Sequence, residues 1–594
     1  MGRVIPPHIK LKGLIVILFF DFEVFKYDWL VVAIDPVEKK EFVIVNNKLE
    51  LEQLYNSYKK DIWVGYNCRN YDQYILKGII CGFDPKRIND WIIVKDRKGW
   101  EFSSMFNKIP LNLFDVMPNP PVSLKTLEGF LGNNIHETSV PFDIERKLTL
   151  NELQETINYC RFDVLNTIEV FIKRKNEFDS QMSLVQTFKL PLSHLGKTQA
   201  QLAAIILGAK KKRFKDEWNI RLPETAQLGR YKAVGDWFLD KANHCYDCKL
   251  DIEICGLTHT IAWGGVHAGK KKYHYKCKPH EIILDIDVDQ LYPTLMIQYG
   301  LLSRAVEEPQ RFKNVLDTSL RLKREGKKKE REPYKRICNI TYGAEGDLFN
   351  PMYDPLHRNL VCVFGQVLII DLLDKIEDLI ELLQSNTDGI FVKLDKRNVP
   401  ELKRRVEQWQ ERTGLKMSYE AFSGMYQKDV NNYIAIPEGD LYDEKGKPRW
   451  HSKGAYVKEL GDLDYDLPIV NEAVKMYMLC GTPVETTVYN CKDFKRFQKI
   501  VKLSNKYKWV EHEHGQGTIK FDNKAYRVFA SLDNSDGRLL KCDGVRNPAK
   551  FGNTPDRCFI YNDNMNGVEI PSKLDREYYV ALAKKRLEDF GVRV

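Results

Sequence analysis

The sequence has little that would place it in a membrane or outside the cell. The apolar run Leu14–Phe20 near its start has only seven residues. A helix that crosses a bilayer needs about 20 apolar residues, and a signal peptide needs a longer apolar core with a cleavage site. The 13 cysteines are scattered and odd in number, which fits reduced thiols better than a disulfide framework. We therefore expect a soluble, cytoplasmic protein without a membrane partner.

A zinc-finger pattern is also missing from the sequence. Cys245 and Cys248 form a C-x-x-C with Cys255 close behind. No second C-x-x-C or histidine pair follows at the spacing of zinc ligands, although His267 and Cys277 lie downstream. Such spacings often arise by chance, so zinc is the less favoured interpretation here.

What the chain does have is length and a mild excess of positive charge. Its 594 residues are too many for one hydrophobic core, so we expect several domains. The formal net charge is only +9, so the distribution of charge matters more than its total. The segment Arg311–Arg336 holds eleven basic residues against four acidic ones and predicts a helical hairpin that turns at Gly326. A charged, solvent-exposed hairpin alone would explain the lysines at its tip.

The most informative stretch is Glu281–Pro293, which reads EIILDIDVDQLYP. Asp285, Asp287 and Asp289 alternate with apolar residues, which predicts a strand with one acidic face. A row of carboxylates is stable if it faces water or if cations neutralise it. An isolated acidic strand is most simply a solvated edge. This one runs into the apolar, aromatic turn Leu291–Pro293, which favours a metal site if a partner carboxylate exists.

Two further segments could complete such a site. Asp388 lies between two apolar runs and is predicted at the tip of a hairpin. A helix that opens at Pro333 would place Lys335, Asn339 and Tyr342 on one face, because they are spaced i, i+4 and i+7. A cation, an amide and an aromatic ring on one stripe suit a triphosphate and a base.

Three motifs in the first 175 residues also carry carboxylates. An acidic pair ends the short apolar strand, and an Asn-rich turn with an Asp opens a predicted helix. A Tyr and an Asp four residues apart share one face of an amphipathic helix. Each motif alone is as often structural, but all three in this order within one domain length make coincidence a poor explanation. The residues are Asp21 and Glu23, Asn67 and Asp72, and Tyr159 and Asp163.

Other segments carry weaker signals. Gly264 and Gly265 follow an aromatic residue and allow a close approach of backbone, although a tight turn between strands explains them equally well. The lysines at 270–272 come next and favour a phosphate contact. Helices are predicted over 123–132 and 198–208, each with a glycine at its end. A further helix is predicted to carry Lys495, Arg496, Lys499 and Lys502.

Together these motifs resemble those of family B DNA polymerases. The segment 287–293 is similar to the family's motif A (DxxSLYP), and 335–343 matches motif B (KxxxNxxYG) without a gap. The segment 386–389 is similar to motif C (DTDS). The three upstream motifs resemble those of DEDD-type 3′–5′ exonucleases, in the subtype that carries Tyr. The segment 431–433 resembles the KxY element that contacts the primer end, with Asn431 in place of the lysine.

The resemblance implies a multidomain α/β and α+β fold, in which an RNase H-like exonuclease precedes a right-hand polymerase. It also implies a monomeric, compact replicase of the bacteriophage type, and it leaves accessory replication proteins undetermined. The implied domains are the exonuclease (1–175), a linker with the start of the palm (176–270), the palm with motif A (271–300), the fingers (301–345), the palm with motif C (346–440), and a primer-grip hairpin with the thumb (441–594).

The implied function is a DNA-directed DNA polymerase that extends a primer 5′ to 3′ and proofreads with a 3′–5′ exonuclease. Its partners would be primer–template DNA and dNTPs. Its cofactor would be Mg²⁺, two ions per active site, with Mn²⁺ as an alternative. The implied metal ligands are Asp287, Asp388 and the Val288 carbonyl in one site, and Asp21, Glu23, Asp72 and Asp163 in the other. Tyr159 would orient water, Tyr292 would exclude a 2′-OH, Lys335, Asn339 and Tyr342 would bind the nucleotide, and Gly264, Gly265, Asn67, Tyr433 and Lys453 would contact DNA.

Motif C departs from the family's pattern, with Asn386 for Asp and Gly389 for Ser, so Asp388 would act alone in its hairpin. Only about 40 residues separate Pro293 from Lys335, which leaves no room for the extra subdomain of the protein-primed branch. The interval 344–385 also looks short for that branch's second insertion. We therefore expect extension of an ordinary nucleic-acid primer. Two alternatives stay open: an exonuclease with an inactive polymerase site, and a non-catalytic nucleic-acid-binding scaffold.

Overall fold

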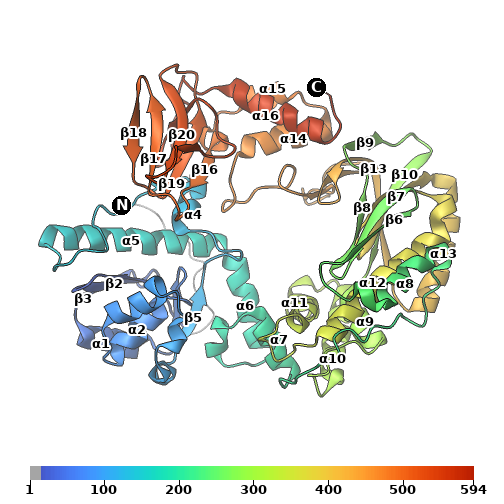
Figure 1. Cartoon of the computed structure of the whole chain (residues 1–594), viewed down its shortest axis with the longest axis horizontal. Helices are drawn as coiled ribbons and strands as arrows, with labels where there is room; N and C mark the ends of the chain where they lie inside the picture. Colours follow the sequence, from blue (N-terminus) through green and yellow to red (C-terminus); the bar gives the residue numbers. More distant parts are fainter. Residues whose placement is uncertain (1–14, 594) are drawn as a thin grey trace. The chain divides into compact units, whose positions relative to one another are not determined.

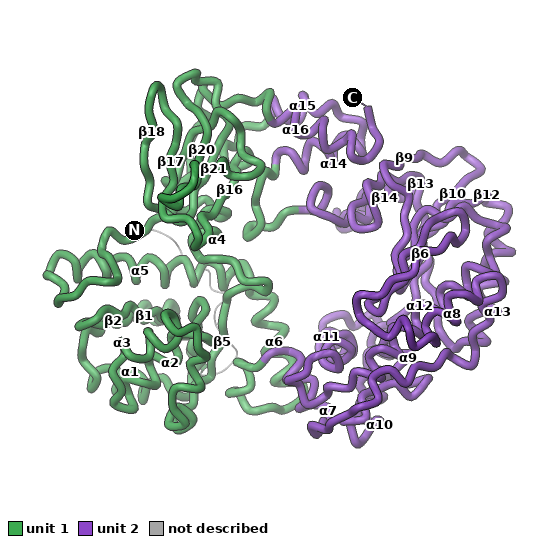
Figure 2. Tube along the Cα trace, viewed as in Figure 1, with its two compact units in different colours: residues 1–197, 460–468, 491–578 green, residues 198–459, 469–490, 579–594 purple. Residues whose placement is uncertain are grey.

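A computed structural model describes residues 15–593, which form two compact units (Figure 2). Unit 1 contains residues up to 197 together with 460–468 and 491–578, and unit 2 contains 198–459, 469–490 and the residues from 579 onward. The chain has a mixed α/β, multidomain fold with several sheets, as the sequence predicts. No helix within residues 15–593 has both the length and the apolar composition that a membrane crossing requires.

The boundaries of the units differ from the predicted ones. The first unit continues past 175 because helix α6 (Lys175–Thr187) buries Phe178 and Met182 in the same core as strand β1. The predicted thumb, 441–594, is divided between the two units. Its middle part joins unit 1 because its strands pack on helix α4 of that unit.

Unit 1 is built around a five-stranded sheet in the order β3-β2-β1-β4-β5. Strands β1 to β3 are antiparallel neighbours, and β4 and β5 run parallel to β1. The alternating side chains of β1 fill two cores: Leu18 and Phe20 pack with helices α1 and α2, and Ile17 and Phe19 pack with α5, on the opposite face of the sheet (Figure 1). The bounds are β1 Ile17–Val24, β2 Trp29–Asp35, β3 Lys40–Val45, β4 Ile62–Gly65, β5 Asn112–Asp115, α1 Lys48–Tyr58, α2 Asp72–Ile80 and α5 Leu150–Lys173.

The first strand was predicted over 14–20, and the prediction was wrong in extent. Leu14 lies outside the described residues, and β1 continues to Val24. Phe22 and Val24 extend the apolar face of the strand. The acidic pair Asp21 and Glu23 therefore lies within the strand and not beyond its end.

Two predicted helices are confirmed, including their end signals. Helix α4 (Leu124–Leu131) begins after Ser123, whose side chain accepts a hydrogen bond from the Thr126 amide, and it ends at Gly132 with φ 82°. Helix α7 (Gln199–Leu207) begins with a capping box at Thr198 and ends at left-handed Gly208.

The C-terminal part of unit 1 consists of two small sheets. One has the order β16-β19-β22 and the other β18-β17-β20-β21. The helix predicted to carry Lys495, Arg496, Lys499 and Lys502 is wrong: the first two lie in a short 3-10 turn, and the last two begin and end β16. The β-branched Ile500 and Val501 between them favour a strand. The bounds are β16 Lys499–Lys502, β17 Trp509–His514, β18 Gly517–Phe521, β19 Ala525–Ala530, β20 Asp536–Cys542, β21 Ala549–Lys550 and β22 Cys558–Ile560.

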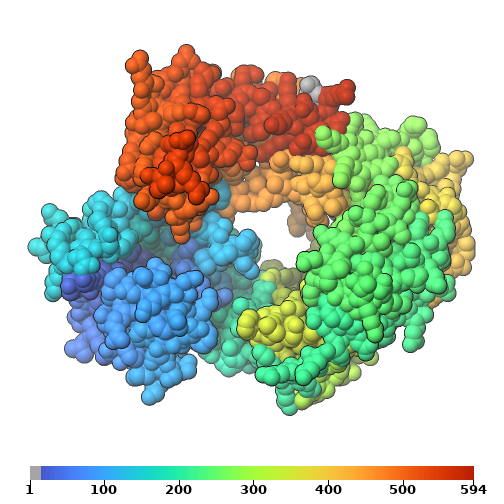
Figure 3. Space-filling model, viewed as in Figure 1, coloured from blue at the N-terminus to red at the C-terminus, as the bar shows by residue number. Residues whose placement is uncertain are grey.

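Arg527 on β19 links these sheets to α4 through hydrogen bonds. Its guanidinium is fully buried and donates to the carbonyls of Gly129 and Asn133 at 3.1 and 2.9 Å, at the end of α4. It also donates to the carbonyls of Tyr561 and Asp563. Figure 3 shows the resulting contact, where the orange surface of these sheets meets the cyan surface of the N-terminal helices. A cation is well suited to the negative end of a helix dipole.

Unit 2 is built around a ten-stranded sheet in which the paired strands are antiparallel. Its order is β15-β14-β13-β10-β12-β11-β8-β7-β6, and β9 also pairs with β13. The long helix α12 (Pro355–Ile376) is buried along most of its length, and Trp409 of α13 (Val399–Thr413) donates to its Leu368 carbonyl at 3.1 Å. The strands are β6 Lys249–Ile254, β7 Leu257–Ala262, β8 Gly265–Gly269, β9 Tyr273–Lys276, β10 Glu281–Val288, β11 Glu381–Ser385, β12 Gly389–Asp395, β13 Met417–Asp429, β14 Asn432–Pro437 and β15 His451–Lys453.

The basic segment of unit 2 forms the predicted helical hairpin. Helices α10 (Pro309–Arg324) and α11 (Lys328–Glu345) meet at a turn with Gly326 in the left-handed region at φ 69°. The predicted start of the second helix at Pro333 is wrong, since α11 begins at Lys328. Residues 328–332 are all Lys, Glu or Arg, which are strong helix formers and extend the helix ahead of the proline.

Candidate active sites: two carboxylate clusters

The first cluster lies in unit 1 on strand β1. Asp21 and Glu23 are two residues apart and therefore point to the same face of the strand. Their carboxylate oxygens and the Cys160 sulfur of α5 all lie within 4.8 Å of one another. The Cys160 thiol donates to the Asp21 carbonyl at 3.4 Å. This group of ligand atoms could hold a metal ion.

Two more carboxylates reach this group from helices. Asp72 begins α2 and is almost fully buried, and its Oδ1 accepts a hydrogen bond of 3.1 Å from the Phe22 amide on β1. Asp163 on α5 is also buried and raises the pKa of both Asp21 and Glu23 through its charge. The structure thus brings all four predicted carboxylates together from three separate segments.

The four carboxylates destabilise one another's charged forms. Burial, followed by the charges of the other three, raises the pKa of Asp21 well above its usual range. Burial likewise raises the pKa of Glu23 and Asp163, and it raises the pKa of Asp72 to about 7. Closely spaced, buried carboxylates need a cation to stay ionised. Oxygen donors of this kind suit a hard divalent ion.

Lys125 of α4 is the one cation that contacts the cluster directly among the contacts described here, and sequence reasoning missed it. Its Nζ lies 2.5 Å from Asp163 and 3.2 Å from Glu128, and both Lys125 and Glu128 are buried. Burial raises the pKa of Glu128 to about 8. A usable signal was present, because a Lys and a Glu three residues apart on the apolar face of a helix are rarely buried without partners.

Tyr159 and Asn67 take different positions around this cluster. Tyr159 is buried beside the carboxylates, and its ring lies 4.6 Å from Lys125 Nζ. An open groove of about 590 Å³ runs past it, lined in part by His136 and Phe162. Asn67 sits in the turn before α2, where its amide donates to Asp115 at 2.9 Å. The contacts of Asn67 are therefore those of a turn residue.

The second cluster lies in unit 2, at the end of β10 and at the tip of the β11–β12 hairpin. Asp285 and Asp287 point to one face of β10, and Asp287 lies opposite Gly389 of β12. The predicted hairpin tip is confirmed, with Asp388 in the turn. The Val288 amide donates to the Asp388 carbonyl at 2.8 Å. This bond holds the tip against the end of the acidic strand.

Glycines let the segments around Asp388 approach closely. A Cβ at Gly389 would lie 1.7 Å from Asp287 Oδ1, so residue 389 leaves room for that carboxylate. A Cβ at Gly265 would lie 2.5 Å from the hydroxyl of Thr387, and that hydroxyl accepts from the Val266 amide at 3.2 Å. Gly265 therefore makes room for the hairpin tip. Gly264, in the turn between β7 and β8, has open space beside it.

His451 is a second residue that the sequence did not reveal. It comes from β15, and its Nε2 lies 2.8 Å from Glu420 while its Nδ1 lies 3.6 Å from Asp285. Hydrogen bonding to Asp285 raises the pKa of His451. Partial burial, followed by the charges of Asp285 and Asp388, raises the pKa of Asp287 to about 7. Asp289, by contrast, forms an ion pair of 2.6 Å with Lys323 of α10.

Two predicted nucleotide-binding residues are in contact. The rings of Tyr292 and Tyr342 lie 4.2 Å apart, where α9 (Leu291–Gln298) meets α11. Lys335 and Asn339 lie on the exposed side of α11. Burial raises the pKa of both tyrosines, and the charge of Arg358 of α12 offsets part of this rise. Arg358 therefore lies near them, and no motif pointed to it.

Tyr433 and Lys453 occupy neighbouring strands. They face each other across β14 and β15. The Tyr433 ring lies 5.3 Å from Phe391 of β12, and the charges of Asp285 and Asp287 add to burial in raising its pKa. Tyr433 is therefore close to the second cluster, with an exposed lysine beside it.

Comparison with known proteins gave no relatives: no protein-family model and no curated protein matches the chain.

Proposed function

We propose that the chain is a DNA-directed DNA polymerase of the family B type, with a 3′–5′ proofreading exonuclease in unit 1 and the polymerase in unit 2. One observation carries the proposal. Two separate carboxylate clusters are each assembled from segments far apart in the sequence, and each coincides with the residues of a predicted motif set.

The fold of each unit supports this assignment. Unit 1 has three antiparallel strands followed by two parallel ones, with helices on both faces, an arrangement expected of an RNase H-like nuclease. Unit 2 has an antiparallel sheet that carries Asp287 on β10 and Asp388 in the turn that precedes the adjacent strand β12, beside a helical hairpin. A palm with fingers would have this arrangement. The interval between Pro293 and Lys335 holds little besides α9, α10 and the start of α11, which supports extension of an ordinary primer.

Both clusters fit divalent metal ions, because their donors are carboxylate oxygens whose charges oppose one another. Asp21, Glu23, Asp72 and Asp163 would hold the ions of the nuclease, and Asp287, Asp388 and the Val288 carbonyl those of the polymerase. When bound, Mg²⁺ supplies Lewis-acid activation of an oxygen nucleophile and neutralises phosphate charge.

Side chains of the protein would orient the water and bind the nucleic acid and the nucleotide. In unit 1, Tyr159 would orient the attacking water, and the groove beside it offers the rings of His136 and Phe162 for stacking of bases. In unit 2, Lys335 and Asn339 on α11 would bind the triphosphate. The ring of Tyr292, fixed against Tyr342, would lie under the sugar and exclude a 2′-OH.

The test is primer extension and primer degradation by the full chain, with two variants and a matched control for each. Asp287→Asn should abolish extension and keep degradation, and Asp21→Asn should do the reverse. Asp289→Asn is the control for the first, because its side chain is engaged with Lys323 away from the cluster. Asp179→Asn is the control for the second, because Asp179 forms an exposed ion pair with Lys175 on α6.

The outcomes separate the proposal from its rivals. Degradation without any extension by the unaltered chain would favour a nuclease with an inactive polymerase site, for which Asn386 is the motivation. Neither activity in Mg²⁺ or Mn²⁺ would favour a non-catalytic scaffold and would overturn the proposal.

A further inference from the structure

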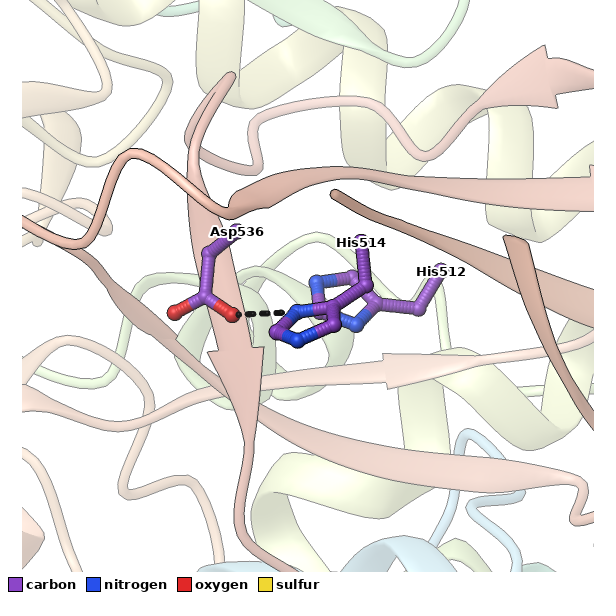
Figure 4. A group of neighbouring side chains, drawn as sticks. All are labelled: His512, His514 and Asp536. Atoms are coloured by element: carbon purple, nitrogen blue, oxygen red, sulfur yellow. Dashed lines mark hydrogen bonds and ion pairs between the residues drawn. The ribbon is translucent and has the colours of Figure 1, made fainter. Parts of the chain in front are cut away.

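Two histidines and an aspartate meet in the C-terminal sheets of unit 1, away from both carboxylate clusters in sequence. His512 and His514 are two residues apart on β17 and share one face of that strand. Asp536 begins β20 and lies directly opposite His514. Figure 4 shows the carboxylate of Asp536 facing the His514 ring, with the His512 ring close behind it. One ligand atom from each residue lies within 4.8 Å of the other two.

A β-bulge in the sheet brings these three side chains together. The pairing of β17 with β20 shifts between His512 and His514, which inserts an extra residue on β20. Such bulges re-aim side chains. Gly537 makes the bulge fit, because a Cβ there would lie 2.6 Å from the Glu513 Cβ. The result is that Asp536 is directed to the histidine face.

The spacing of the donors suits a small tetrahedral ion. His514 Nδ1 and Asp536 Oδ1 are 3.2 Å apart. Zinc ligands about 2.0–2.1 Å from the ion lie about 3.3 Å apart in a tetrahedral site. The pair therefore already has the separation of two zinc ligands.

Two of the three candidate ligands, His512 and Asp536, also form hydrogen bonds to neighbouring groups, as metal ligands commonly do. His512 is buried, and its Nε2 lies 2.6 Å from the Cys558 carbonyl. Donation to that carbonyl puts the proton on Nε2 and leaves the Nδ1 lone pair free, an arrangement typical of metal-binding histidines.

Asp536 is oriented in the same way. Its Oδ2 accepts from the Ser531 hydroxyl at 2.6 Å and from Lys573 Nζ at 3.1 Å, while Oδ1 faces His514. Asp536 is buried and His514 is exposed, so a fourth position would be open to water. A simple ion pair between Asp536 and Lys573 explains the contacts of Oδ2, but it does not explain why two imidazoles lie next to the same carboxylate.

We propose that His512, His514 and Asp536 bind a divalent transition-metal ion, with zinc as the occupant, and that the ion clamps β17 to β20. Two nitrogens and one oxygen favour zinc over Mg²⁺, which prefers oxygen ligands alone. The site is independent of the proposed polymerase and nuclease activities.

The test is metal binding by the full chain after treatment with a chelator, using Co²⁺ as the spectroscopic probe and Zn²⁺ as the competitor. We expect about one equivalent of Co²⁺ to give the strong visible absorption of a low-coordinate, nitrogen-ligated ion, and Zn²⁺ to displace it. The group of Asp21, Glu23 and Cys160 could also bind Co²⁺, so only the absorption that His514→Ala removes is assigned to the histidine site. His514→Ala should remove this absorption, and His280→Ala, at another exposed histidine, should keep it.

A second variant keeps the test decisive if His514→Ala does not fold. Ser531→Ala keeps all three ligands, removes one outer partner, and should weaken Zn²⁺ binding by about 10–100-fold. The melting temperature of each metal-free variant reports whether it is folded. No strong absorption from the unaltered chain, or equal absorption from a folded His514→Ala variant, overturns the proposal. Neither result bears on extension or degradation of DNA.

Discussion

Asp287 and Gly389 face each other across β10 and β12, and the carboxylate of Asp287 fills the space that a side chain at 389 would need. A Cβ there would lie 1.7 Å from Asp287 Oδ1. Gly389, which stands where motif C of the proposed family has Ser, thus has a steric reason in this chain, and the two residues act as a matched pair.

We expect Gly389→Ala to lower primer extension on the order of 100-fold, because a catalytic group displaced by about 1 Å can cost that much. Degradation in unit 1 should not change. Gly552→Ala, where a Cβ meets open space, is the control. Extension rates measured under single-turnover conditions check this, and an unaltered rate would show that the carboxylate tolerates the displacement.

Tyr292→Ala should admit ribonucleotides. Removal of the ring that lies 4.2 Å from Tyr342 opens space at the proposed sugar position, and we expect ribonucleotide use relative to deoxynucleotide use to rise about tenfold or more. Tyr442→Ala removes an exposed tyrosine and is the control. The measurement is the ratio of kcat/KM for the two nucleotides, and constant discrimination would contradict the assignment.

His451→Gln should shift the acidic limb of the extension profile to higher pH. Burial raises the pKa of Asp285 and Asp287, and the positive charge of His451 offsets part of this rise, so without it both carboxylates hold their protons to higher pH. We expect a shift of about 0.5–1 pH unit, measured from pH 5.5 to 9 at saturating Mg²⁺. A rate reduced by the same factor at every pH would mean a purely structural role.

The metal-free chain should lose stability as the pH rises. Burial raises the pKa of Asp72 to about 7, against about 3.9 in an unfolded chain. Between these values the folded state binds more protons than the unfolded state, so the free energy of unfolding falls from about pH 4 to about pH 7. Asp72→Asn should flatten this slope, and added Mg²⁺ should raise the melting temperature more at pH 8 than at pH 6. A flat profile for the unaltered chain would contradict this.

Arg527→Met should destabilise unit 1 by on the order of 3–5 kcal/mol, because it leaves several buried carbonyls without a donor. Arg538→Met removes an exposed ion pair with Glu513 and should have no measurable effect. Denaturant unfolding checks both. Equal stability of the two variants would show that water replaces the guanidinium.

Local patterns predicted much of the fold. The alternation in 281–288 predicted β10, and the glycine at 132 predicted where α4 ends. Spacing along one helix placed Lys335 and Asn339 on the exposed side of α11. Each of these features depends on neighbours within a few turns or strand residues, so a single sequence carries enough information.

Long-range relationships were the part that could not be predicted. His451 reaches Asp285 from more than 160 residues away, and no periodicity links the two. Lys495 to Lys502 were assigned to a helix because their charges recur, whereas the pairing of β16 with β19 decides the structure. The contact of Lys125 with Asp163 was overlooked for the same reason, since Asp163 belongs to a distant helix.

The interrupted path of the chain through unit 1 affects how the protein can be made. Residues 491–578 supply Arg527 and its sheets to a unit whose other residues mostly precede residue 198 and are synthesised well before them. The end of α4 therefore stays uncovered until this later segment has been made. Expression of residues 1–197 alone would yield a fragment that lacks this cover, and a circularly permuted gene would be the better way to obtain unit 1 by itself.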